Sequence, residues 1–181
     1  MTDPLRSASK LLSRLLRHQP QQAGLTLDPA GWVDVDAVLA GMARLGRPLT
    51  RTDLELVVRS NDKQRFALSE DGLRIRARQG HSVPVELGYL PAEPPPVLWH
   101  GTPAHNLPAI RSQGLLRGAR HHVHLSADPD TARRVGARRG NAVVLQVDAA
   151  RMHALGHTFF RSDNGVWLTE HVPAEFLAEL P

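Results

Sequence analysis

The sequence predicts an α+β protein built from two lobes of similar size. Helix-period segments dominate up to about residue 60, and short strand-period segments dominate after residue 97. Between the two regions lies PVELGYLPAEPPPV (84–97), whose five prolines exclude a regular helix. We therefore expect a first lobe at residues 1–83, an extended linker at 84–96 and a second lobe at 97–181.

The first helix of the first lobe is strongly patterned. Asp3-Pro4 is a helix-start signal, apolar residues recur at helical spacing behind it, and Pro20 stops the helix. Lys10, Arg14 and Arg17 follow at i, i+4 and i+7 on the side opposite the apolar face, with His18 beside them. The apolar positions are Leu5, Ala8, Leu11, Leu12, Leu15 and Leu16.

The rest of the first lobe is typical of two more helices and a hairpin. One helix is predicted at 34–45, and another from Thr52 to about residue 60 with Glu55 in capping-box register. RFALSEDGLRIRAR (65–78) alternates around Asp71-Gly72, which is a β-hairpin signal. Three short helices followed by a hairpin predict a winged helix-turn-helix, a shape that binds nucleic acid or serves as scaffold.

The second lobe is rich in short strands. Helices are expected at 103–114 and 128–140, and Asn164-Gly165 predicts another hairpin. No GxGxxG follows a predicted strand and no Walker P-loop is present, so any bound nucleotide must be held by a different kind of binding motif. The predicted strands are VLWHG (97–101), HVHLS (122–126), NAVVLQVDA (141–149) and GVWLT (165–169).

The composition excludes several classes of protein. Hydrophobic and charged contents of 41% and 22% are those of a globular chain rather than a disordered one. There is no run of 18 apolar residues and no charged-then-apolar leader, so we expect neither a membrane-spanning helix nor a secretory signal. The absence of cysteine excludes disulfides, thiolate catalysis and cysteine-ligated zinc, and it fits a cytoplasmic protein. Without heptads or an extended apolar surface, we expect a monomer.

The basic residues are almost all arginine, since only Lys10 and Lys63 of the 22 are lysine. Arginine offers a planar fork of donors that matches phosphate oxygens two at a time. Codon bias in a GC-rich genome explains such an excess equally well, so the placement of the charges decides. Residues 4–27 and 94–127 contain no Asp or Glu. Two acid-free basic stretches in a chain with 18 carboxylates predict an anion-binding surface.

The stretch GARHHVHLS (118–126) carries three histidines beside an arginine. If it is extended, Arg120, His122 and His124 share one face and His121 takes the other. A zinc site usually adds carboxylate or thiolate ligands, yet the chain has no cysteine, no HExxH and no acidic residue near this stretch. We therefore expect this face to receive phosphate rather than a metal.

Four further segments carry residues suited to an anion or a nucleotide. Arg17 and His18 close the first helix, where arginine is also common because it favours the helix dipole. Lys63 and Arg65 stand at the entry to the hairpin, and Gly80 allows close backbone approach. An aromatic, an imidazole, a glycine and a hydroxyl in WHGT suit a ribose or a flat heterocycle. The segments are LLRHQP (15–20), NDKQRF (61–66), RIRARQGHS (74–82) and WHGT (99–102).

In their order and spacing these motifs resemble the NAD-dependent tRNA 2′-phosphotransferases of the KptA type. The resemblance covers about residues 7–177. One departure is Arg78, because asparagine is expected before QGHS. The matching segments are, in chain order, LLRHQP, GLTLDPAGWVDVDAVL, NDKQRFALSEDGLRIRARQGHS, LWHGT, IRSQGL, RHHVHLS and DNGVWLTEHVP.

The resemblance implies a winged-helix RNA lobe joined to an ADP-ribosyltransferase-like lobe with a split β-sheet. It also implies removal of an internal RNA 2′-phosphate, typically left by tRNA ligation during splicing, with NAD+ as the acceptor and no metal. In the first step the phosphate attacks the nicotinamide-bearing ribose carbon and nicotinamide leaves. In the second, the ribose 2″-hydroxyl attacks phosphorus, which frees the RNA 2′-hydroxyl and ADP-ribose 1″,2″-cyclic phosphate.

The resemblance further implies roles for individual residues. Arg17 and Arg65 match the arginines that hold the 2′-phosphate, and Arg120 matches one that stabilises charge on it during transesterification. His18 is the candidate general acid or base of the second step. Glu170 is the one acid to consider for the glutamate that many ADP-ribosyltransferases use. The residues matched to NAD+ contacts are His100, Gly101, Thr102 and Ser126, with Gly80 and His81 as weaker additions.

Two other functions stay open on the sequence alone. An ADP-ribosyltransferase that caps terminal phosphates of RNA or DNA would use the same residues and stop after the first step, and release of dephosphorylated RNA discriminates it. A non-catalytic winged-helix regulator that senses NAD+ would not need the four catalytic candidates to act on one phosphate. Binding that stays intact after Arg65→Ala would favour this regulator.

Overall fold

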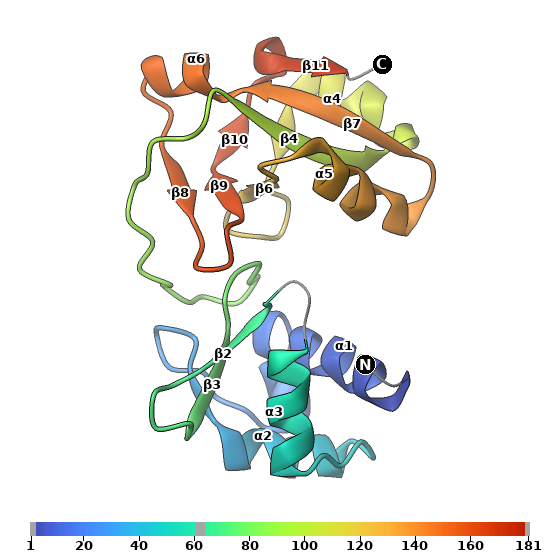
Figure 1. The fold of residues 1–181 in the computed structure, drawn as a ribbon, viewed down its shortest axis with the longest axis vertical. Coiled ribbons are helices and arrows are strands. Elements are labelled where there is room, and N and C mark those ends of the chain that lie inside the picture. Colours follow the sequence, from blue (N-terminus) through green and yellow to red (C-terminus); the bar gives the residue numbers. More distant parts are fainter. Residues whose placement is uncertain (1–2, 61–63, 180–181) are drawn as a thin grey trace. The chain divides into compact units, whose positions relative to one another are not determined.

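The chain divides into two units, Met1–Gly88 and Tyr89–Pro181 (Figure 1). They are seen in a computed structural model that describes residues 3–60 and 64–179. The division falls inside the predicted linker, residues 84–96. This linker is described throughout and contains no helix, and within it Pro91 forms an antiparallel bridge to Phe160.

The first unit packs three α-helices against a small antiparallel sheet. Leu12 and Leu16 are fully buried, and with Val38 and Leu54 from the other two helices they belong to one hydrophobic core. The first two predicted helices and the hairpin around Asp71-Gly72 are confirmed. The elements are α1 (Asp3–Arg17), the 3-10 helix η1 (Pro20–Ala23), β1 (Val33–Asp34), α2 (Val35–Arg44), α3 (Arg51–Arg59), β2 (Phe66–Leu68) and β3 (Arg74–Ala77), with sheet order β1-β3-β2.

Helix α3 begins earlier than the sequence predicts. The Thr50 hydroxyl accepts a hydrogen bond from the Asp53 N–H at 3.1 Å, and the Asp53 carboxylate accepts one from the Thr50 N–H, also at 3.1 Å. This reciprocal pair is a capping box, so Thr50 rather than Thr52 is the N-cap. Glu55 was assigned the wrong role, because its carboxylate instead pairs with Arg51 one turn away, at 3.1 Å.

The second unit contains two three-stranded antiparallel sheets and a two-stranded one. Their orders are β11-β7-β4, β6-β9-β8 and β10-β5. The first two sheets are joined at Trp99 and Ser126, which exchange backbone hydrogen bonds of 2.9 and 2.7 Å. The strands are β4 (Val97–Pro103), β5 (Leu115–Leu116), β6 (Val123–Leu125), β7 (Ala142–Asp148), β8 (Phe159–Arg161), β9 (Trp167–Thr169), β10 (His171–Val172) and β11 (Leu177–Glu179).

Short helices flank these sheets. Helix α5 packs on β4 and β7 (Figure 1). The four predicted strands, both predicted helices and the hairpin at Asn164-Gly165, which joins β8 to β9, are confirmed, whereas β5, β10, β11 and α6 were not predicted. The helices are η2 (Ala104–Asn106), α4 (Leu107–Gln113), α5 (Pro129–Gly136), η3 (Ala137–Arg139), α6 (Ala149–Ala154) and η4 (Ala174–Phe176).

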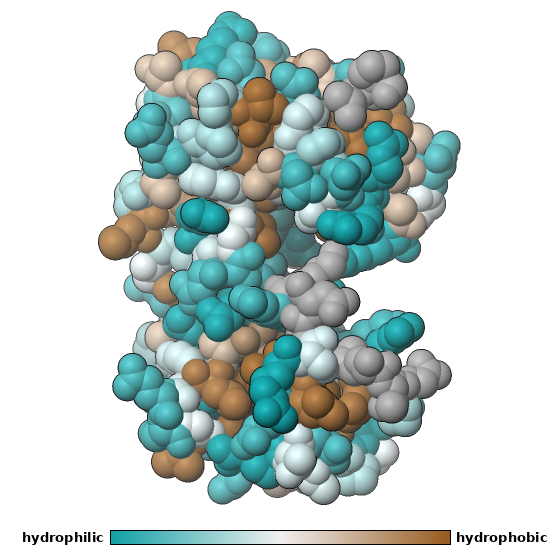
Figure 2. All heavy atoms as spheres, viewed as in Figure 1, coloured by the Kyte–Doolittle hydropathy of each residue, from teal (hydrophilic) through white to brown (hydrophobic). Residues whose placement is uncertain are grey.

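The core of the second unit lies among these strands and helices. Leu98, Val147 and Phe159 are fully buried there. The molecular face in Figure 2 is largely hydrophilic, with hydrophobic side chains in small separate groups. Within residues 3–60 and 64–179, no helix has both the length and the apolar character needed to cross a membrane.

Candidate active site

The end of α1 carries the first two predicted catalytic residues. Lys10 and Arg14 are exposed, but Arg17 is only 8% exposed, so the expectation that the three share one outward side is wrong for Arg17. The chain that follows β3 packs against this end of the helix. There the Ser82 N–H donates to the Arg17 carbonyl at 2.9 Å, and a 2.9 Å hydrogen bond joins Ser82 Oγ to His18 Nδ1. The segment thus covers the helix end and holds the His18 ring.

Ser82 is a residue that the sequence interpretation missed. The signal was present, because Ser82 closes the QGHS motif directly after Gly80 and His81. Gly80 has a φ of 84°, in the left-handed region that favours glycine, and His81 is almost fully buried. The structure therefore places Gly80 and His81 beside the Arg17–His18 pair in the first unit, and their assignment as NAD+ contacts stays a prediction.

Arg65 lies at the other end of this segment, where β2 begins. Its carbonyl accepts a hydrogen bond from the Arg78 N–H at 2.9 Å, and Arg78 Nε donates to the Phe66 carbonyl at 3.2 Å. Arg78, the departure from the family pattern, thus fixes the start of the hairpin. Lys63 lies outside the described residues. The segment 78–82 therefore links two parts of the candidate site. It is bonded to Arg65 at Arg78 and to the end of α1 at Ser82.

In the second unit, His100 on β4 is mostly buried and is bonded to the neighbouring sheet. Its Nδ1–H donates to the His124 carbonyl at 3.1 Å. Burial lowers the pKa of His100 below its usual 6.5, and this outweighs the raising effect of the hydrogen bond to His124, while the charge of Arg120 lowers the pKa further. The ring is therefore neutral at pH 7, and with the proton on Nδ1 its Nε2 is a hydrogen-bond acceptor.

Ser126 and Thr102 complete the set of polar side chains predicted around His100. The Trp99–Ser126 bridge brings Ser126 next to β4. Thr102 lies two residues beyond His100 on the same strand face, where its hydroxyl accepts a hydrogen bond from Asn106 Nδ2 at 3.0 Å. Asn106 was also missed, since nothing in its local sequence marks it.

Gly101 has a clear packing role in addition to its predicted one. A Cβ at this position would overlap the Ala132 carbonyl oxygen, and it would lie 2.5 Å from the Ala132 carbonyl carbon and 3.0 Å from the Gly136 nitrogen. Conversely, a Cβ on Gly136 would lie 2.8 Å from the Gly101 carbonyl carbon. Two glycines facing each other thus let α5 pack directly on the backbone of β4. A contact between Gly101 and NAD+ remains a prediction.

Arg120 lies in an exposed turn rather than on a strand. Strand β6 begins only at Val123, Gly118 has a φ of 61°, and the Arg120 N–H donates to the Arg117 carbonyl at 3.2 Å. The expected alternation from Arg120 to His124 is therefore wrong, because the turn interrupts it. Arg120 still lies within electrostatic reach of His100, whose pKa its charge lowers.

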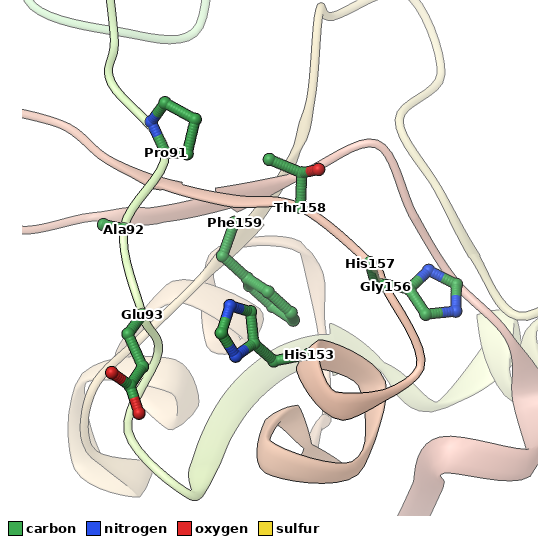
Figure 3. Close-up of a pocket in the computed structure, with 8 residues that line it drawn as sticks. All are labelled: Pro91, Ala92, Glu93, His153, Gly156, His157, Thr158 and Phe159. Atoms are coloured by element: carbon green, nitrogen blue, oxygen red, sulfur yellow. The ribbon is translucent and has the colours of Figure 1, made fainter.

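A separate hollow of about 260 Å³ lies between the extended chain and the loop after α6 (Figure 3). None of the predicted site residues lines it. In the described part of the chain, no group of three or more His, Asp or Glu side chains is placed to hold a metal ion. The residues that line the hollow are Pro91, Ala92, Glu93, His153, Gly156, His157, Thr158 and Phe159.

Comparison with known proteins identifies the family of the chain. Residues 3–171 match the model of the RNA 2′-phosphotransferase, Tpt1 / KptA family. A probable RNA 2′-phosphotransferase of Burkholderia lata is 61% identical over 173 residues, which cover 95% of this chain and 89% of the relative. A protein of the same name from Pseudomonas aeruginosa strain PAO1 is 57% identical, over 97% of this chain and 97% of the relative. Another, from Streptomyces coelicolor, is 58% identical, over 93% of this chain and 92% of the relative. The chain belongs to the RNA 2′-phosphotransferase family.

Proposed function

We propose that this protein transfers an internal RNA 2′-phosphate to NAD+ in two steps. Family membership supports the substrate class. The observation that carries the proposal is the Arg17–His18 pair at the end of α1, where Arg17 is buried, His18 is partly exposed, and both are hydrogen-bonded to Ser82 of the QGHS segment. In this proposal the first unit serves as a winged-helix RNA lobe and the second as an ADP-ribosyltransferase-like lobe.

In the proposed first step an oxygen of the 2′-phosphate bonds to C1″ of the nicotinamide ribose. The bond from C1″ to the pyridine nitrogen breaks, and neutral nicotinamide leaves with the electron pair. A phosphate monoester has its second pKa near ~6, so the nucleophile is already largely ionised at pH 7 and needs positioning more than deprotonation. Arg17 and Arg65 supply that positioning as planar bidentate donors.

In the proposed second step the ribose 2″-hydroxyl attacks phosphorus and the bond to the RNA 2′-oxygen breaks. One proton leaves the attacking hydroxyl and one reaches the departing RNA oxygen. His18 suits both transfers, because its ring is oriented by Ser82 and an imidazole nitrogen can either accept or donate a proton. Arg120 is proposed to stabilise the charge that develops on the phosphoryl oxygens.

The polar groups on β4 and directly after β6 fit NAD+ as a co-substrate. Neutral His100 presents Nε2 as an acceptor, which suits a ribose hydroxyl, and the Ser126 hydroxyl stands next to β4 through the Trp99–Ser126 bridge. No step of this chemistry calls for a metal ion. We therefore propose NAD+ as the co-substrate and a metal-independent reaction.

The test mixes the purified protein with a short RNA bearing one internal 2′-phosphate, with and without NAD+ and in the presence of EDTA. Mass spectrometry follows both RNA and nucleotide products. We expect RNA lighter by one phosphate together with ADP-ribose 1″,2″-cyclic phosphate. RNA that gains ADP-ribose and keeps it would instead establish a phosphate-capping enzyme. Unchanged RNA and unchanged NAD+ would overturn the proposal.

Two variants locate the chemistry in this assay. Arg65→Ala should lower the rate by about 100-fold or more, the usual cost of removing a charged donor from a phosphoryl transition state. Arg14→Ala, an exposed arginine one turn before the site, is the matched control and should react like the wild type. Equal rates for all three proteins would remove Arg65 from the site.

A further inference from the structure

Three ring side chains from distant segments meet in the second unit. Tyr89 comes from the extended chain, His122 from the turn before β6, and Phe160 from β8. The His122 ring packs edge to face against both others, with centroid separations of 6.4 Å to Tyr89 and 5.3 Å to Phe160. We call these three residues the ring cluster.

The ring cluster lies on the face of its sheet opposite the core. Neighbouring strand residues point to opposite faces, so Phe159 is fully buried in the core while Phe160 stands on the other side and is partly exposed. Phe160 and His124 both pair with Leu168 of β9, one from each side, so they point to the same face of the sheet. The Phe160 backbone also forms a bridge to Pro91. All three rings of the cluster keep part of their surface in water.

The charges around the ring cluster are mainly positive. Burial lowers the pKa of His122, and the charges of His121 and Arg117 lower it further, against a weaker raising effect of Glu170. His122 is therefore a neutral flat ring at pH 7. Arg117 and Arg120 are both exposed in the adjacent turn, which lies within the acid-free stretch 94–127.

We propose that the ring cluster stacks a base of the RNA strand that carries the 2′-phosphate, an inference that rests on the proposed function. Partly exposed aromatic rings beside arginines are the usual means of binding single-stranded RNA, because every base offers a flat face and every nucleotide a phosphate. This chemistry favours RNA over an apolar protein surface. Against an apolar surface the positive charges of Arg117 and Arg120 would have no anionic partner, whereas RNA supplies phosphates.

The test uses RNAs of five nucleotides with a central 2′-phosphate, in which each flanking base in turn is replaced by an abasic residue. Binding is measured without NAD+ by the anisotropy of an end label, for wild type and Phe160→Leu. Leucine keeps an apolar side chain but removes the flat face. We expect one abasic position to weaken wild-type binding by about 5- to 100-fold. In Phe160→Leu the same abasic position should make no difference.

Phe176→Leu is the control, because Phe176 is another ring of this unit that contacts a histidine, His157 at 5.7 Å. It should keep the abasic effect, and melting curves confirm that each variant is folded. An abasic effect of the same size in Phe160→Leu would overturn the proposal, as would wild-type binding that ignores every abasic position. Unmodified RNA of the same sequence separates the two ideas. A Phe160-dependent abasic effect on unmodified RNA supports the stacking site even if the 2′-phosphorylated RNA is not converted in the NAD+ assay, so the two proposals can fail separately.

Discussion

The substitution Gly101→Ala tests whether this glycine serves packing or the co-substrate. An added Cβ would overlap the Ala132 carbonyl oxygen and lie 2.5 Å from its carbonyl carbon, roughly 1 Å closer than ordinary contact distances of ~3.5 Å allow. The neighbours are backbone atoms of α5, so no side-chain rotation relieves the clash, and the helix must move off β4. Overpacking typically costs about 1–3 kcal/mol, and this clash belongs at the upper end.

The assay is thermal unfolding followed by far-UV circular dichroism, with hydrogen exchange to localise the effect. A loss of about 3 kcal/mol should lower the melting midpoint of the second unit by roughly 12–24 °C. Protection should fall in α5, while α1 of the first unit keeps its protection. Gly136→Ala should cost less, because its Cβ would approach the Gly101 carbonyl carbon only to 2.8 Å. A Gly101→Ala protein with wild-type melting and a raised KM for NAD+ would refute the packing argument.

Three further substitutions test other contacts. Ser82→Ala removes the hydrogen bond to His18 Nδ1, which is worth about 1 kcal/mol, so the rate of phosphate transfer should fall several-fold. An unchanged rate would mean that Ser82 does not orient His18. Thr50→Ala should destabilise the first unit by about 1 kcal/mol in urea titrations. Because hydrogen bonds from Thr50 lower the pKa of Asp53 below 3.8, this deficit should shrink as the pH falls below that value, and a constant deficit would contradict the capping box. Burial lowers the pKa of His100 below 6.5, so the unfolded chain binds the proton more readily and the stability of the wild type should decline as the pH drops below 6.5. Melting curves between pH 5 and 7.5 should show a smaller decline for His100→Asn.

Elements with strong local signals were predicted well from the sequence. The apolar period of α1, the Asp71-Gly72 turn and the apolar strand β7 depend on neighbours in the chain, and each formed where its pattern indicated. The strands that were missed are short, and some depend on distant partners. For example, β5 pairs with β10 through Leu115 and Val172, which no local pattern reveals.

The candidate site shows the same division between local and distant causes. Motif matching found Arg17 and His18, but helical periodicity placed Arg17 outward, because the periodicity of one helix does not show the distant segment of Ser82 that packs against its end. Likewise, Gly101 was selected because it belongs to the HGT motif, whereas the backbone of α5 is what excludes a side chain there. The motif segments of this chain therefore combine residues proposed for the chemistry with residues that serve packing. Only variants that report stability and turnover separately assign each residue to one of the two.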